Sequence, residues 1–359
     1  MTASYKLVQW NRHKRIYDAV IALACAGYLA SFVAFGMMTH EPPNSIDVPI
    51  LAMRALGTLA IVLVHLILLI GPMARLTTLA APLLYNRRHL GVTFFLIALL
   101  HGLIATGYYG GFGVHNPASS VLASYADFRS VSGFPFEVLG FLALLIFFVM
   151  AATSHDFWLA ALGPRFWKSL HMLVYAAYVL VMAHVALGPL QSEPNALYIV
   201  LLSAGGAAVV SAHVVAAVKE RRVDRAPAPD ADADGWIHAA DIEDLDDNAA
   251  MVVCVRDAER IALVRHGDKV SAVSNVCAHQ GGPLGEGRVI DGCLTCPWHG
   301  YQYRPAEGQS PPPYSETIPT YEVRLDGSRI MVNPRPNAPG TPVEPVRVAA
   351  DRREGGTSS

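Results

Sequence analysis

Apolar residues are concentrated in the first two thirds of this 359-residue chain. Six stretches are nearly free of charge, and each approaches the roughly 20 residues with which a helix crosses a bilayer. They cover residues 16–38, 48–71, 90–109, 135–153, 169–188 and 196–218. The pattern predicts an α-helical membrane bundle of six transmembrane helices over 16–218. We expect the first stretch to be retained, because it is too long for a signal-peptide core and five others follow it.

Basic residues mark one side of the predicted bundle. They precede the first stretch, lie between the second and third and between the fourth and fifth, and follow the sixth, whereas the alternate loops are acidic or nearly uncharged. Because positive loops stay in the cytoplasm, we expect segment 1–15 and the C-terminal part to be cytoplasmic. The protein is then predicted to be an integral protein of a bacterial inner membrane.

The last third of the chain has a different pattern. Residues 219–235 combine charge, Pro and Ala without periodicity and are predicted to be a linker. Short alternating segments with Gly-rich turns follow over 236–333 and predict a small all-β domain. Residues 334–359 are rich in Pro, Gly, Arg and Glu and are predicted to be a disordered tail.

Composition agrees with a chain that is half membrane protein and half soluble domain. Hydrophobic residues make up 53% and charged residues only 16%, against about a quarter in an average soluble protein. The net charge of −2 gives no basic field that would attract nucleic acid. The five cysteines show no regular spacing, which argues against a secreted disulfide scaffold.

Two short motifs in the predicted β domain carry a metal-ligand pattern. They read Cys277-Ala278-His279 and, after a gap, Cys296-Pro297-Trp298-His299. Two thiolates on one iron and two imidazoles on the other are the ligands of a Rieske [2Fe–2S] cluster. We therefore predict Cys277, His279, Cys296 and His299 as cluster ligands. A zinc or redox pair of Cys293 with Cys296 is the less favoured alternative, because Cys296 already belongs to this pattern.

Histidines inside the predicted helices are candidate heme ligands. His101 lies in the third stretch, and His171 and His184 lie thirteen residues apart in the fifth. On one straight helix that spacing is about 3.6 turns, which separates the two rings by about 20 Å along the helix axis. An ionisable residue within a membrane is a functional candidate by default, although a hydrogen bond between helices is the simpler alternative. His65, His115 and His213 are weaker candidates.

These features resemble the ferric reductase-type transmembrane domain over about 48–190. The resemblance is carried by Arg87-Arg88-His89-Leu90-Gly91, His101, Trp167-Lys168-Ser169-Leu170-His171 and His184. The family includes NADPH oxidases, ferric reductases and the heme-bearing subunit of the bacterial methionine sulfoxide reductase system. The resemblance implies b-type hemes that pass electrons across the membrane.

The pairing of the heme ligands has alternatives. The NADPH oxidase scheme implies an inner heme on His101 and His171 and an outer heme on His115 and His184. A glycine run before His115 should, however, end that helix. A depth estimate instead pairs His101 with His184. We expect two b-type hemes with His101, His171 and His184 as ligands, and His115, His65 or His213 as the fourth.

The β domain resembles the Rieske family over its full length, and the ferredoxins of aromatic-ring oxygenases more than the quinol-oxidising type. The latter has an extra Cys in each ligand loop, where this chain has Gly282 and Trp298, and a Ser where it has Tyr301. The resemblance also implies that the prolines at 311–313 cover the cluster.

Together, the two halves predict an oxidoreductase component that carries electrons through a membrane. We expect a cytoplasmic NAD(P)H-dependent flavoprotein reductase or a ferredoxin as donor, then the cluster, then the hemes, then an acceptor that the sequence does not identify. Reversed flow from quinol to a soluble partner and a redox sensor are the alternatives. A Rieske oxygenase is disfavoured because no residues remain for a catalytic iron domain.

Overall fold

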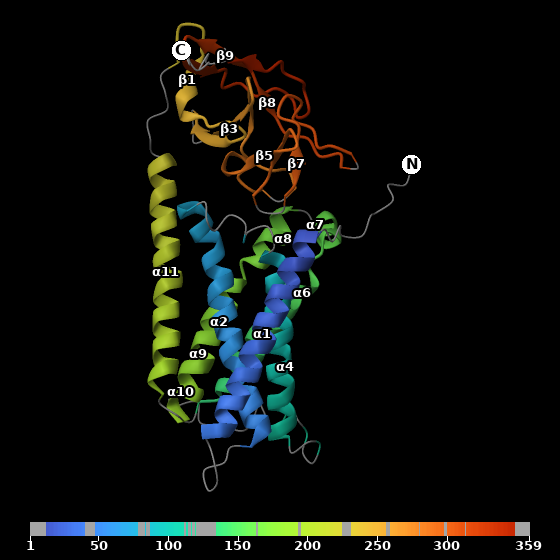
Figure 1. Cartoon of the computed structure of the whole chain (residues 1–359), viewed down its shortest axis with the longest axis vertical. Helices are drawn as coiled ribbons and strands as arrows, with labels where there is room; N and C mark the ends of the chain where they lie inside the picture. Colours follow the sequence, from blue (N-terminus) through green and yellow to red (C-terminus); the bar gives the residue numbers. More distant parts are fainter. Residues whose placement is uncertain are drawn as a thin grey trace, which may run out of the picture. The chain divides into compact units, whose positions relative to one another are not determined.

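The computed structural model describes residues 12–39, 47–77, 83, 87–110, 113, 116, 119, 134–162, 164–192, 195–224, 231–255, 259–279, 281–297, 300–312 and 314–348. Figure 1 shows the course of the chain. The chain divides into two compact units, one of residues 1–74 and 86–214, the other of residues 75–85 and 215–359.

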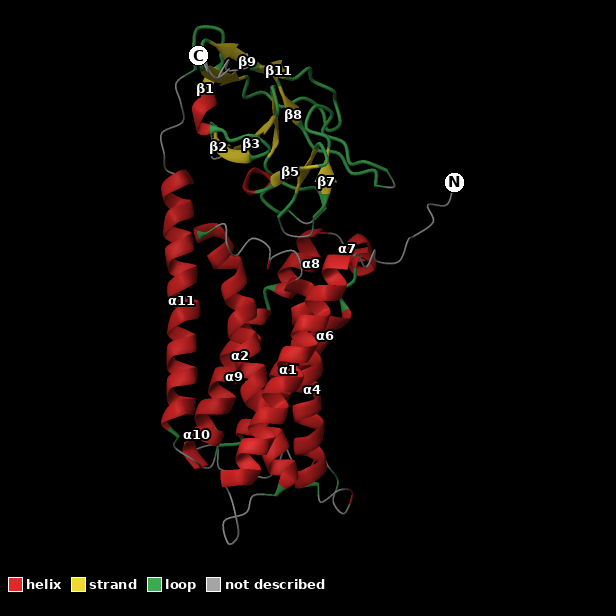
Figure 2. Cartoon of the chain, viewed as in Figure 1, coloured by secondary structure: helices red, strands yellow, loops and turns green. Residues whose placement is uncertain are grey.

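The first unit is built of helices, drawn red in Figure 2. They are α1 (Arg12–Thr39), α2 (Val48–Leu76), α4 (Arg87–Tyr109), α6 (Phe136–Ala152), α7 (Asp156–Leu162), α8 (Pro164–His171), α9 (Val174–Leu187), α10 (Pro189–Ser192) and α11 (Ala196–Asp224), the last of which continues into the second unit. Among the described residues, five helical spans are long and apolar enough to cross a membrane, and α6 is a shorter apolar helix of 17 residues. The predicted membrane bundle of six apolar helices is confirmed.

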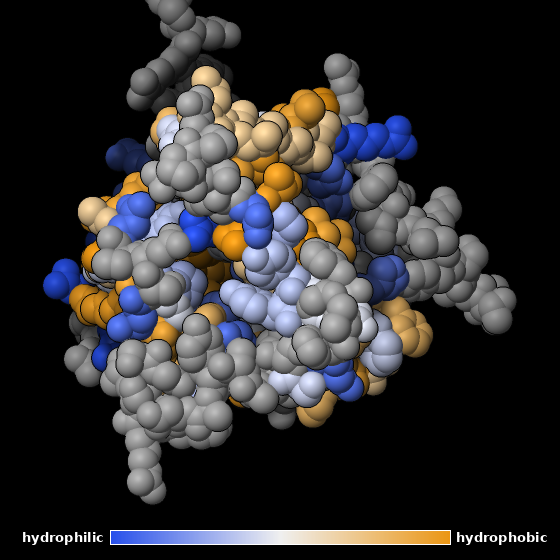
Figure 3. Space-filling view, turned by 90° about the horizontal axis from the view of Figure 1, so that it is seen from below, coloured by the Kyte–Doolittle hydropathy of each residue, from blue (hydrophilic) through white to orange (hydrophobic). Residues whose placement is uncertain are grey.

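Burial in this unit matches helices that face lipid. Helix α2 supplies much of the core, and its Ala55 and Val64 are each only 1% exposed. Large apolar side chains on α1 and α11 point outward; Leu23 is 73% exposed and Val210 61%. Figure 3 looks along the helices and shows apolar residues spread between polar ones around a hollow. An apolar outer surface of this extent is stable in hydrocarbon and not in water.

The fifth predicted span is not one continuous helix. A tightened turn joins α8 to α9 directly after His171, where Leu173 N–H donates to Leu170 O and Tyr175 N–H to Met172 O, both at 3.2 Å. Hydrogen bonds between residues three apart are those of a 3₁₀ turn. The expected separation of His171 and His184 assumed an unbroken helix, which this turn interrupts.

The second unit carries the predicted all-β domain. Its strands are β1 (Ile237–Asp241), β2 (Ala250–Cys254), β3 (Arg260–His266), β4 (Lys269–Ser274), β5 (Arg288–Ile290), β6 (Cys293–Thr295), β7 (Gln302–Tyr303), β8 (Thr320–Tyr321), β9 (Val323–Asp326), β10 (Arg329–Val332) and β11 (Val346–Arg347). They form three antiparallel sheets in the orders β1-β10-β9, β11-β4-β3-β2 with β8 on β4, and β5-β6-β7.

Strand β3 is the centre of this domain because both of its faces are buried. Alternate side chains of a strand point to opposite faces. Ile261 and Leu263 pack into one core, with β1 and β10, and Ala262 and Val264 pack into a second core. The second core also contains Cys277 and Cys296, so the predicted ligand loops are anchored in it.

Two predicted boundaries are corrected. Helix α11 continues to Asp224, so the first residues of the predicted linker 219–235 are helical; Lys, Glu and Arg are good helix formers, and the helix ends before the Pro-containing part. Residues 334–348 of the predicted tail belong to the folded domain, because Val346 and Val348 pack against the core and β11 pairs with β4.

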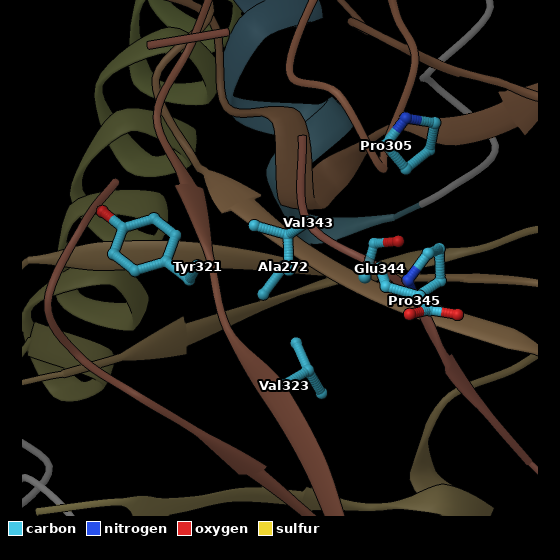
Figure 4. Close-up of a pocket in the computed structure, with 8 residues that line it drawn as sticks. Ala272, Pro305, Tyr321, Val323, Val343, Glu344 and Pro345 are labelled. Atoms are coloured by element: carbon cyan, nitrogen blue, oxygen red, sulfur yellow. The ribbon is translucent and has the colours of Figure 1, made fainter. Parts of the chain in front are cut away.

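The segment before β11 packs against β4, β8 and β9 of the β domain. Val343 and Pro345 lie over Ala272, Tyr321 and Val323 around a small recess (Figure 4). The recess has no room for a water molecule. We therefore interpret it as a packing seam that fixes the C-terminal segment and not as a ligand site.

Candidate functional site

The two predicted cluster loops share a hydrogen-bond pattern at their described residues. In each, the N–H of the cysteine (Cys277 or Cys296) donates to the carbonyl five residues later, at 2.9 and 2.7 Å. Gly281 and Gly300, four residues after the cysteines, donate back to the cysteine carbonyls at 2.7 and 2.9 Å. Their φ angles are +72° and +69°, which glycine adopts without strain. At the described residues, both cysteines are therefore held by the same pair of backbone hydrogen bonds.

Both thiols are buried and suited to an iron–sulfur cluster. Cys277 is 1% exposed and Cys296 2%, and neither is in a disulfide. His279 is half-buried in the first loop, whereas its predicted counterpart His299 lies outside the described residues. No group of three or more His, Cys, Asp or Glu converges on one point within the described part of the chain. A Rieske cluster requires none, since each iron takes only two protein ligands.

Two tyrosines surround the first loop. The hydroxyl of Tyr303, a fully buried side chain, lies 3.5 Å from Cys277 Sγ and accepts the Ala278 N–H at 3.0 Å. The ring of Tyr301 stacks on His279 with centroids 4.7 Å apart and planes 9° apart. Burial raises the pKa of both phenols, so they remain protonated donors. A neutral phenol beside Cys277 is suited to donate to a thiolate ligand.

The Tyr301 hydroxyl does not turn toward the cysteines. It donates to Glu316 Oε2, on the segment that follows the prolines at 311–313. Glu316 is not among the residues that the sequence motifs single out. The quinol-oxidising Rieske pattern has a Ser at the position of Tyr301, so the hydroxyl in this chain has a different partner.

In the helical unit, His101 of α4 and His184 of α9 face each other. Their ring centroids are 6.4 Å apart and their planes are nearly perpendicular, at 85°. Each Nδ1 bonds a backbone carbonyl of a neighbouring helix at 2.9 Å: Met53 O of α2 for His101, and Phe136 O of α6 for His184. A carbonyl can only accept, so Nδ1 carries the proton and Nε2 keeps its lone pair for a metal.

Each of these rings also packs against a glycine. In both cases the glycine lies four residues after the residue whose carbonyl the ring bonds. A Cβ on Gly57 of α2 would lie 3.2 Å from His101 Cε1, and one on Gly140 of α6 would lie 2.8 Å from His184 Nδ1. The two seats therefore share one design, a carbonyl at position i and a glycine at i+4. We call them the α2 seat and the α6 seat.

The separation of the two rings fits one iron between them. Imidazole nitrogen binds first-row metals at about 2 Å, so rings on opposite sides of one metal have centroids about 6 Å apart. The observed 6.4 Å matches this arrangement. Chemically, the pair is suited to the two axial positions of a heme iron.

His171 is held in another way. Its Nδ1 bonds Trp167 O at 3.0 Å, and its ring stacks on the Trp167 indole with centroids 3.7 Å apart. The indole is itself fixed, because its Nε1–H donates to Thr153 O at 2.8 Å. His171 Nε2 is buried and has no hydrogen-bond partner among the described residues, which leaves it suited to bind a metal.

The structure brings together His101 and His184, the pair expected from helix depth, and not His101 and His171. His65 packs against Gly205 and its Nδ1 bonds Ile61 O at 2.6 Å. His213 Nε2 accepts from the Tyr175 hydroxyl at 3.1 Å. His115, the ligand implied by the NADPH oxidase scheme, lies outside the described residues.

Comparisons with known families divide the chain as its fold does. Residues 56–182 match the family model of the ferric reductase like transmembrane component, and residues 235–322 match that of the Rieske [2Fe-2S] domain. The two matches do not overlap.

Among named relatives, the chain is 35% identical over 131 residues to the protein-methionine-sulfoxide reductase heme-binding subunit MsrQ of Ralstonia nicotianae, covering 36% of this chain and 55% of that protein. It is 34% identical over 74 residues to the anthranilate 1,2-dioxygenase ferredoxin subunit of Burkholderia cepacia, covering 20% of this chain and 68% of that protein. It is 32% identical over 107 residues to the cholesterol 7-desaturase nvd of Xenopus laevis, covering 29% of this chain and 23% of that protein. The match to MsrQ spans about half of that relative's length.

Proposed function

Because this chain is a ferric reductase-like transmembrane domain fused to a Rieske [2Fe–2S] domain, we propose that it carries electrons from the cluster to b-type hemes between its helices. The electrons then pass to an acceptor at the far side of the membrane or within it. One observation carries the proposal: a single polypeptide contains both the paired cysteine loops and a facing pair of imidazoles among helices of membrane length.

We propose that His101 and His184 would together hold one heme. The two seats aim both Nε2 atoms away from the carbonyls that bond Nδ1, and the 6.4 Å ring separation suits a single iron. The MsrQ relatives, which are heme-binding subunits by name, support heme as the group held there. A bound b-type heme would supply a one-electron couple inside the membrane.

We propose His171 as a ligand of a second heme, with His115, His65 and His213 as the alternatives for its partner. The buried Nε2 of His171 supports this role. The stacked and hydrogen-bonded Trp167 fixes the plane of its ring.

For the cluster, we propose Cys277 and Cys296 on one iron and His279 and His299 on the other. The shared hydrogen-bond pattern of the loops and the buried thiols support the two cysteines. A bound cluster would accept and release one electron at a time. Tyr303 would donate a hydrogen bond toward the Cys277 thiolate, and the burial of both cysteines limits the access of water to them.

We propose that the Rieske domain and both termini are cytoplasmic, in a bacterial inner membrane, because the basic loops alternate with acidic ones in the order that the positive-inside rule requires. The donor is then a cytoplasmic NAD(P)H-dependent flavoprotein reductase or a ferredoxin. The dioxygenase ferredoxin relative supports a soluble electron partner for this domain.

The α6 seat gives a direct test of heme ligation. Gly140→Ala is expected to lose the heme held by His184, because the new methyl would overlap the imidazole at 2.8 Å from Nδ1. Heme content per protein, measured as the pyridine hemochrome, reports the loss.

Gly91→Ala is the matched control for this variant, since no atom lies within 4 Å of a Cβ at Gly91 of α4. Alanine in a helix interior is otherwise about 0.5–1 kcal/mol more favourable than glycine, so the control should keep its heme and its stability. Equal heme contents in the two variants would show that the α6 seat holds no ligand.

The direction of electron flow is tested on membranes that contain the protein. Anaerobic addition of NADH and a flavoprotein reductase is expected to produce the absorption bands of reduced b-type heme. The same membranes should remain oxidised when NADH is added without the reductase. Heme reduction by a quinol alone, with the cluster then reduced from the heme side, would contradict the proposed direction and favour the reverse one.

A further inference from the structure

The tyrosine that stacks on His279 is hydrogen-bonded to a carboxylate that no cluster motif contains. Glu316 Oε2 accepts the Tyr301 hydroxyl and also the Ser315 N–H, the latter at 3.1 Å. Tyr301 is only 7% exposed, and its ring is nearly parallel to that of His279. A chain of three groups therefore runs from the carboxylate through the phenol to a proposed cluster ligand.

Both Tyr301 and Glu316 are held in place by backbone hydrogen bonds. Tyr301 belongs to the second ligand loop, where its carbonyl accepts the Cys296 N–H at 2.7 Å. Glu316 belongs to the segment after the prolines, where its carbonyl accepts the Ser310 N–H at 3.0 Å. Tyr314 of the same segment packs on the Tyr301 ring at 4.9 Å. The phenol is thus clamped between two loops and cannot rotate away from His279 without breaking these contacts.

We propose that Glu316 is a positioning residue for the cluster: acting through Tyr301, it holds the phenol ring flat against His279 and lowers the midpoint potential of the cluster. The inference rests on the cluster assignment of the proposed function and is independent of the direction of electron flow.

The direction of the effect on the midpoint potential follows from charge. With two thiolates and two neutral imidazoles, an oxidised Rieske cluster carries no net charge and the reduced cluster carries a single negative charge. A nearby carboxylate repels that added charge, and the repulsion is stronger in a partly buried site than in water. Glu316 is half-buried, so its charge disfavours the reduced state and the potential falls.

The test is a redox titration of the full-length chain at one pH, followed by the electron paramagnetic resonance signal of the reduced cluster. Glu316→Gln keeps an acceptor for the Tyr301 hydroxyl but removes the charge. Its potential is expected to shift upward while iron and sulfide contents stay at the wild-type level. The matched control is Glu322→Gln, which removes a charge from an exposed carboxylate that accepts the Asn333 amide at 3.0 Å and does not touch Tyr301.

A double-mutant comparison separates action through Tyr301 from a charge effect on the whole domain. Tyr301→Phe keeps the ring on His279 and the charge of Glu316 but removes the hydrogen bond that links them. Glu316→Gln should raise the potential less in the Tyr301→Phe background than in the wild-type background, because the effects of coupled groups are not additive. Tyr301→Leu removes the ring and should alter the g values of the reduced cluster, which Tyr301→Phe should leave near wild type.

Equal potentials for Glu316→Gln and Glu322→Gln, or additive shifts in the double variant, would overturn the inference. If Glu316→Gln loses its cluster, Glu316→Asp decides: it keeps the charge and is expected to retain both the cluster and a potential near wild type. A raised potential in Glu316→Asp would count against the proposal. A wild-type protein with no Rieske signal would instead overturn the cluster assignment itself.

Discussion

His184→Ala is expected to lose about half of the protein's heme, because the heme that His101 and His184 would hold between α4 and α9 loses one of its two imidazoles. His101→Ala should produce the same loss, since the two rings face each other 6.4 Å apart. The double variant should lose no more heme than either single variant. Hemochrome content and the Soret band of purified protein measure these effects.

The control for this experiment is His155→Ala. His155 accepts the Phe157 N–H at 3.2 Å at the start of α7, and no cofactor is proposed there. Full heme content in His184→Ala would refute the ligand assignment. A larger loss of heme from the double variant than from either single variant would show that the two residues serve different hemes.

The second large effect is expected at the entry point for electrons. With NADH and the flavoprotein reductase present, the rate of heme reduction in membranes containing Cys296→Ser should fall to the rate in membranes without the protein. A serine oxygen is a poor replacement for a thiolate on iron, and Cys296 is buried at 2% exposure in the core beneath the loops. The heme content should stay unchanged, because the helical unit does not depend on this side chain. Stopped-flow spectroscopy in the heme bands gives the rate.

Cys293→Ser is the matched control, only three residues earlier and half-buried on β6. It should reduce the hemes at the wild-type rate if the cluster uses Cys296 and not a Cys293–Cys296 pair. A normal rate in Cys296→Ser would mean that electrons reach the hemes without the cluster. A slow rate in Cys293→Ser with an intact cluster would reopen the pairing of the two cysteines.

Much of the fold could be predicted from the sequence because the signals are local. A long uncharged stretch predicts a membrane helix by its length alone, and the paired Cys-x-His and Cys-x-x-His motifs predict ligand loops by their spacing. Gly281 and Gly300 follow the two cysteines at equal distances, so the repeated hydrogen-bond pattern is also visible in the sequence.

The pairing of histidines could not be predicted in this way, because it depends on contacts between helices. The estimated separation of His171 and His184 assumed one straight helix, and the tightened turn after His171 interrupts that helix. The acceptors that hold His101 and His184 are backbone carbonyls 48 residues away in the sequence. Glu316 was missed for the same reason, since a single carboxylate after a proline run has no pattern of its own.

The ordered part of the C-terminal segment was missed because its signal is weak. Val343, Val346 and Val348 are single apolar residues among prolines and charges, and β11 has only two residues. Its order comes from pairing with β4 and from packing over the sandwich, which composition does not reveal.

The α2 and α6 seats use main-chain oxygen to select the tautomer of each imidazole. A substitution at position 53 changes the side chain there but leaves the oxygen in place. Sequence divergence at that position is therefore compatible with an unaltered ligand, whereas sliding α2 or α6 by a single residue would move both the oxygen and the glycine out of reach. The binding of both imidazoles therefore depends on the register of α2 and α6. Insertions and deletions within these helices should be far more damaging than point substitutions.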